Sequence, residues 1–185
     1  MKRRTTTLIT KFILVFFVTT MPFSISYAQP YGTGAYGSST YQNGTGQLSL
    51  SIATSGNVNI PIAPTSSGVL ASGTNAVTVT TNDSYGYELY IRALSNTNMN
   101  SSASSIPTSA NVTPLALSTN TWGYNTDAST NFVGISLTDT LIHAITIAAP
   151  GGDITNVKYG IKLDLSKPAG SYVANIVYTA VPKTN

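Results

Sequence analysis

Residues 157–165 read VKYGIKLDL, and their side chains alternate between apolar and polar or small. Successive side chains of a β-strand point to opposite faces of the sheet, so the pattern predicts a strand with one face in a core and one in water. The apolar face would consist of Val157, Tyr159, Ile161, Leu163 and Leu165, and the polar face of Lys158, Lys162, Asp164 and Ser166.

A second strand is predicted directly after the first. Residues 167–170, KPAG, combine a proline and a glycine, which is typical of a turn. The apolar alternation then resumes with Tyr172, Ala174, Ile176 and Tyr178. We therefore expect the last strand to lie antiparallel beside residues 157–165.

The same period of two runs through most of the chain from Gln47 onward, and no stretch of ten or more residues shows a helical period. Pro61 lacks an N–H group, so the strand around it is expected at a sheet edge. A long Ser/Asn/Pro-rich connection separates the two halves, from Ser95 to about Pro114. The further strands predicted are residues 48–52, 58–62, 77–79, 87–91, 132–137 and 141–148.

Eight or nine short strands without helices predict an all-β fold. The expected architecture is a two-sheet antiparallel sandwich of immunoglobulin-like type, formed by residues 47–185. A barrel is the alternative. The chain has no cysteine, so its core must hold the fold together without disulfides.

The first 28 residues have the layout of a secretory signal peptide. Four positive charges precede an apolar run from Phe12 to about Phe23, and the segment ends in Ser26-Tyr27-Ala28. An uncleaved membrane anchor is the weaker alternative, because spanning a bilayer takes about 20 apolar residues. We expect cleavage after Ala28 and secretion of the mature chain.

Residues 29–46 form a Gly/Tyr/Ser-rich leader that is expected to be flexible. It would serve either as a linker or as an adhesive segment that uses its spaced tyrosines. The neighbouring segment 48–52, LSLSI, could complete the sheet of another subunit, so self-association by strand addition is a further expectation.

The charge of the mature chain argues against nucleic acid as a partner. Cleavage would remove four of the nine basic residues and no acidic one, which leaves a net charge of 5 − 6 = −1. Proteins that bind phosphates or anionic lipid need clustered basic side chains. The remaining ones are scattered, so nucleic acid and anionic lipid are not expected as partners. Export and the Ser/Thr/Asn-rich solvent faces favour cell-envelope or surface polymers or neighbouring protein subunits instead. The remaining basic residues are Arg92, Lys158, Lys162, Lys167 and Lys183.

The residue inventory predicts no enzyme, no cofactor and no metal site. His143 is the only histidine and shares the parity of Leu141 and Ile145, so it is expected as a satisfied core or interface residue. No Gly-x-Ser-x-Gly elbow and no His/Cys ligand spacing occurs. Glu88 is expected to pair with Arg92 on one face of a strand. Single carboxylates in turns usually cap the backbone rather than bind calcium, and here they are Asp83, Asp127 and Asp153.

The only tryptophan lies in residues 120–125, NTWGYN. Trp122 and Tyr124 are two residues apart, so in a strand they share one face, and Gly123 leaves the other face bare. This arrangement suits either a core wedge or an exposed platform for carbohydrate or peptidoglycan. The core interpretation is favoured because a small sandwich needs large aromatic side chains, and residues 47–185 contain one phenylalanine, Phe132. In this interpretation Tyr124 packs beside Trp122, and Gly123 is expected because the opposite side of the strand is closely approached.

Four segments resemble secreted β-sandwich surface proteins of bacteria, in particular WxL-like and pilin-subunit-like domains. In those families a Thr-Asn-x-x-x-Gly-Tyr strand is followed late in the chain by a Pro-x-Gly-x-Tyr hairpin. The resemblance implies a pilin-like sandwich at the bacterial cell surface that serves as a structural or adhesive subunit of a surface fibre or of the envelope. No Trp-x-Leu triplet occurs, so peptidoglycan binding does not follow from it. The segments are TNDSYGYELYI (81–91), NTWGYN (120–125), VKYGIKLDL (157–165) and PAGSYVANIVYTAV (168–181).

Overall fold

A computed structural model describes residues 48–184, which contain nine β-strands and no helix. The predicted signal peptide and leader lie outside the described residues. The strands are β1 (Leu50–Thr54), β2 (Val69–Thr81), β3 (Tyr87–Ala93), β4 (Met99–Asn100), β5 (Ser105–Ile106), β6 (Thr121–Asn125), β7 (Thr140–Ala144), β8 (Ala149–Leu163) and β9 (Ile176–Pro182).

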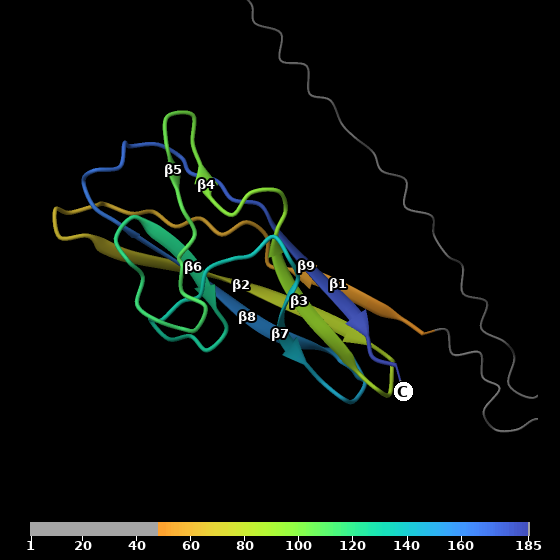
Figure 1. The fold of residues 1–185 in the computed structure, drawn as a ribbon. Coiled ribbons are helices and arrows are strands. Elements are labelled where there is room, and N and C mark those ends of the chain that lie inside the picture. The colour runs from red at the N-terminus through yellow and green to blue at the C-terminus, as the bar shows by residue number, and fades with distance from the viewer. Residues whose placement is uncertain (1–47, 185) are drawn as a thin grey trace, which may run out of the picture. The chain divides into compact units, whose positions relative to one another are not determined.

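The strands form two main antiparallel sheets that pack face to face (Figure 1). One sheet has the order β1-β2-β8-β6 and the other has the order β7-β3-β9. A small ribbon, β4-β5, lies outside both sheets. The predicted all-β, two-sheet architecture is therefore confirmed, and the described part of the chain does not close into a barrel.

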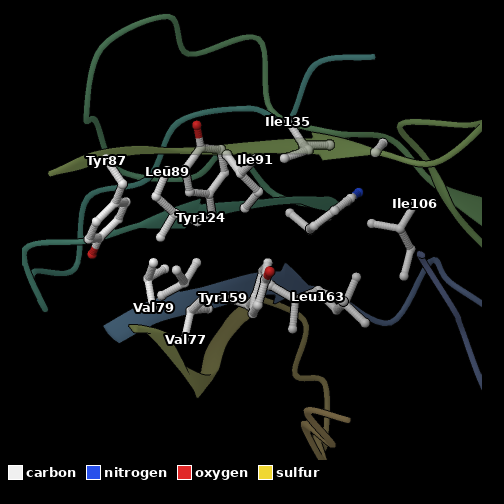
Figure 2. Close-up of a cluster of buried hydrophobic side chains, with 14 residues drawn as sticks. Val77, Val79, Tyr87, Leu89, Ile91, Ile106, Tyr124, Ile135, Tyr159 and Leu163 are labelled. Carbon is white, nitrogen blue, oxygen red and sulfur yellow. The ribbon is translucent and has the colours of Figure 1, made fainter. Parts of the chain in front are cut away.

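The core lies between the two sheets. Tyr87, Leu89 and Ile91 of β3 point toward the other sheet, where Val77 and Val79 of β2 and Tyr159 of β8 face them (Figure 2). On β8 the predicted apolar face is buried from Val157 to Leu163, so its parity is confirmed.

Leu165 departs from the predicted pattern, with 67% of its surface exposed. β8 ends at Leu163, and a turn follows in which Asp164 accepts hydrogen bonds from the backbone N–H and the hydroxyl of Ser166. The apolar–polar alternation of the sequence therefore runs two residues past the end of the strand, whereas the alternation of burial ends with the strand at Leu163.

The predicted hairpin of the last two strands is wrong. β9 pairs with β3, and residues 164–175 carry the chain from one sheet to the other. β8 has no edge available for β9, because β2 and β6 occupy its two sides. The two strands still meet across the core, where the hydroxyls of Tyr159 and Tyr178 are 2.5 Å apart.

Residues 57–62 are not a strand, although every second side chain is half-buried as predicted. Val58 and Ile60 pack over Gly73 of β2, where an added Cβ would lie only 2.6 Å from Cγ1 of Val58. No hydrogen bond joins the backbone of residues 57–62 to another residue of the described part. The alternation thus reports side-chain packing without strand pairing.

Two other predicted strands are also corrected. Residues 132–137 make only isolated bridges, from Phe132 to Leu115 and from Val133 to Tyr124. In β7, Leu141 is half exposed and Ile142 packs against the core, the reverse of the predicted parity, whereas Ile145 packs against the core as predicted. The cause is a register shift between Leu89 and Tyr90 where β3 meets β7.

The parity of β8 can be tested by comparing two neighbouring residues. Ile161→Ala should lower the free energy of unfolding by about 2–5 kcal/mol, because it empties a buried aliphatic position. Lys162→Ala should be nearly silent, because the Lys162 side chain faces away from the core. Equal losses in urea unfolding of the two variants would contradict this assignment.

Candidate functional site

The only histidine belongs to a three-residue cluster that joins the two sheets. Oδ2 of Asp153 on β8 accepts a hydrogen bond from the Tyr87 hydroxyl on β3 at 2.8 Å, and it lies 2.8 Å from Nε2 of His143 on β7. The rings of Tyr87 and His143 are 6.1 Å apart. The His143 and Asp153 side chains are each about two-thirds buried. The predicted satisfied histidine is therefore found at the edge of the core.

The pKa values of this cluster are shifted by its own contacts. Burial acts to raise the pKa of Asp153, but the hydrogen bonds from Tyr87 and His143 outweigh it and hold the pKa below its usual value. Burial, followed by the hydrogen bond and the charge of Asp153, raises the pKa of Tyr87. Asp153 is thus a carboxylate that holds its two neighbours in place.

This arrangement predicts a pH-dependent contribution to stability. A carboxyl group with a depressed native pKa stabilises the fold above its unfolded pKa of about 3.9, and the stabilisation is lost as the pH falls through the native pKa. Asp153→Asn should therefore lower the free energy of unfolding at pH 7. The difference from the unmodified protein should shrink between about pH 5 and pH 2.

Urea unfolding across this pH range provides the measurement. Asp139→Asn is the matched control, because Asp139 forms only an exposed pair with Arg92 at 3.4 Å. A loss in Asp153→Asn that is independent of pH would show that the ionised carboxylate is not the stabilising species.

Trp122 and Tyr124 are both buried, with 3% and 4% of their surfaces exposed. The indole Nε1–H of Trp122 donates to the carbonyl of Thr97 at 3.0 Å, and its ring lies 6.4 Å from that of Tyr159. Burial raises the pKa of Tyr124. This is the arrangement that the core interpretation predicts, and the two side chains do not form an exposed platform.

Gly123 of β6 and Gly160 of β8 lie opposite each other in the sheet. A side chain at either position would point to the face away from Trp122 and Tyr124. An added Cβ at Gly123 would lie 2.3 Å from the carbonyl oxygen of Val133, so the predicted close approach is confirmed. The Phe132 ring covers Gly160 and is fully buried. Phe132 therefore packs outside the sheet rather than between the sheets, which corrects its expected place in the core.

A cavity of about 310 Å³ lies beside Trp122. It separates the half-buried segment 57–60 from the start of β9. Asparagine and tyrosine groups line it together with aliphatic side chains. The lining includes Asn57, Val58, Asn75, Trp122, Tyr159 and Tyr178.

All six acidic residues of the chain make structural contacts. Asp83 and Asp127 accept the backbone N–H groups of Tyr85 and Ser129, as expected for turns. The predicted Glu88–Arg92 pair is wrong, because Glu88 accepts the Tyr90 hydroxyl while Arg92 pairs with Asp139. Asp153 and Asp164 bind as described above.

The described residues contain no group of three or more His, Cys, Asp or Glu side chains that could hold a metal ion. In the loop 125–131, the Lys158 ammonium donates to the carbonyls of Ala128 and Ser129, at 3.1 and 2.7 Å. The positive charge near the Asp127 carboxylate is therefore that of Lys158.

Sequence reasoning missed the contacts made across the sheets. Tyr87, His143 and Asp153 come from three strands, and only a known sheet order brings them together. The one available signal was the parity of Asp153 with Val157, which places its carboxylate on the core side of β8.

No protein family, curated protein or solved structure matches this chain. Among the described residues, no helix is long and apolar enough to cross a membrane.

Proposed function

We propose that the chain is a secreted, non-enzymatic structural or adhesive protein of the bacterial cell surface, a subunit of a surface fibre or of the envelope. Its sandwich would belong to the immunoglobulin-like or pilin-like type. One observation carries the proposal: the single histidine and all six acidic side chains are engaged in contacts that hold strands and turns together. The groups that most often perform acid–base chemistry are thus used for the scaffold.

The outer faces of the sheets support the same role. β2 exposes Ser72 and Thr74, with Thr78 and Thr80 along the same outer face. These hydroxyl groups, beside Lys158 and Lys162 of β8, can hydrogen-bond to envelope polymers and to neighbouring subunits, the partners expected from the sequence. The apolar run and cleavage motif of residues 1–28 support export.

The test is to label intact and permeabilised cells of the source bacterium with an antibody against residues 48–184. Equal labelling of both, with removal of the signal by external protease, is the expected result. Labelling only after permeabilisation would overturn the proposal, as would hydrolysis of isolated envelope polymers by the purified protein.

The cavity favours a second candidate function, a carbohydrate- or peptidoglycan-binding module. Its lining includes tyrosine hydroxyls and asparagine amides, which are groups that can hydrogen-bond to the hydroxyls of sugars. Ala174→Leu would fill the cavity from its rim without removing any of these groups. Retention of the protein on isolated envelope polysaccharide, lost in Ala174→Leu, would favour this candidate.

A further inference from the structure

The free edge of β9 is unusual among the four strand edges of the two sheets. β6 is covered, because it makes bridges to Thr108 and Val133. β7 is short and has an irregular register against β3. β1 is five residues long and lies close to β9 of the other sheet. β9 is seven residues long, and no described strand hydrogen-bonds to its outer edge, although β1 of the other sheet lies close to it.

The hydrogen bonds at the two ends of β9 show which backbone groups its free edge presents. Leu94 N–H donates to Asn175 O, and Lys183 N–H donates to Gly86 O. Hydrogen-bonded pairs alternate along an antiparallel ladder, so the odd-numbered residues of β9 point their backbone groups toward β3. Ile176, Tyr178 and Ala180 therefore point theirs away, and none of these groups has a partner among the described residues.

The sequence of this edge lacks the features that usually prevent edge pairing. β9 reads IVYTAVP, with no charged residue and with proline only at its end. Natural edge strands are usually protected by lysines, internal prolines or bulges. A neutral strand rich in β-branched and aromatic residues also carries no charge that would repel an identical strand.

We propose that β9 pairs edge to edge with β9 of a second copy of this chain, and so joins two three-stranded sheets into one. A two-fold axis at Thr179 places this residue opposite its own copy and Val177 opposite Val181 of the second copy. Tyr178 and Ala180 then exchange backbone hydrogen bonds between the copies. The cross-strand pairs on the outer face are Thr–Thr and Val–Val, which are favourable combinations.

This inference deepens the proposed structural role by naming its partner and contact surface, but the two can fail separately. Cell labelling tests the location, whereas the edge pairing is tested with the purified full-length protein. A protein that pairs through β9 but lies inside the cell would refute only the proposed function. A surface protein that remains monomeric would refute only the inference.

The chain has no cysteine, so a single introduced thiol reports the register. Opposite residues of a non-hydrogen-bonded antiparallel pair have Cα atoms about 4.5 Å apart, which is within the range that a disulfide spans. Thr179→Cys should therefore form a covalent dimer under mild oxidation. Leu141→Cys on the edge strand β7, where the side chain is half exposed, is the matched control and should stay monomeric.

A charge on the same edge should weaken the association without changing the core. Val181 is 42% exposed, so Val181→Lys is expected to fold and to raise the dissociation constant in sedimentation by about tenfold or more. Leu141→Lys should leave the constant unchanged. The proposal is overturned if the unmodified protein stays monomeric at its highest soluble concentration, or if Thr179→Cys crosslinks no faster than Leu141→Cys. Loss of dimers on deletion of residues 48–52 with Val181→Lys silent would instead identify strand addition by that segment.

Discussion

Replacement of Trp122 by alanine should lower the free energy of unfolding by about 3–5 kcal/mol, the usual cost of emptying a large buried aromatic position. Two contacts of the indole are lost, and the cavity beside it is enlarged. The indole ring packs beside Tyr159, its N–H satisfies the carbonyl of Thr97, and its face borders the cavity. The cavity would grow, and the Thr97 carbonyl would lose its indole hydrogen bond.

Trp122→Phe separates these contributions. It retains most of the ring volume but removes the hydrogen-bond donor, so its loss should be smaller than that of Trp122→Ala. Urea unfolding of both variants supplies the two free energies.

Fluorescence gives an independent measurement because Trp122 is the only tryptophan. A buried indole should emit toward the blue and resist quenching by acrylamide. Emission near that of free indole, with easy quenching and an unchanged stability of Trp122→Ala, would favour an exposed binding platform instead.

The sequence predicted the features of this fold that depend on one strand at a time. The alternation of β8 and β3 places their apolar faces correctly, because a period of two reports which side chains are buried. The spacing of Trp122 and Tyr124 predicted their common face in the same way. Gly123 was interpreted correctly because a bare position between two aromatics implies a close neighbour on the other side.

The sequence could not predict which strands pair. The turn residues 167–170 suggested a hairpin, yet β9 crosses to the other sheet because β2 and β6 already occupy both sides of β8. Sequence proximity favours pairing of neighbouring strands, but competition for edges is a property of the whole sheet. The cluster of Tyr87, His143 and Asp153 was unpredictable for the same reason.

Segment 57–62 shows a different limit. Its alternation is genuine and its apolar side chains pack on Gly73, but it has no ladder of backbone hydrogen bonds. Pro61 removes one donor, and the segment lies against side chains rather than beside a strand. Periodicity therefore identifies a half-buried extended chain and does not distinguish it from a strand.

The contact of Phe132 with Gly160 should produce the strongest coupling between two residues in the described part of the chain. A Cβ added at Gly160 would lie 2.4 Å from two atoms of the Phe132 ring and 2.8 Å from a third. The ring is fully buried, and the Lys158 ammonium lies 5.9 Å from its centroid, so it has little space to move. Gly160→Ala should cost about 1–3 kcal/mol or more by overpacking, and Phe132→Ala about 3–5 kcal/mol by leaving a cavity.

The double variant decides whether this contact is the cause. With the ring removed, the Gly160→Ala methyl group has space, and alanine also restricts the unfolded chain more than glycine does. Gly160→Ala should therefore be neutral or slightly stabilising in the Phe132→Ala background, although it is destabilising alone. Gly151→Ala is the matched control, since an added Cβ there meets no atom within 4 Å. Free energies of unfolding for the four proteins give the coupling directly, because distant substitutions add and contacting ones do not. If the two losses simply add, Phe132 does not pack on Gly160, and the outer face of β6 and β8 must be covered in another way.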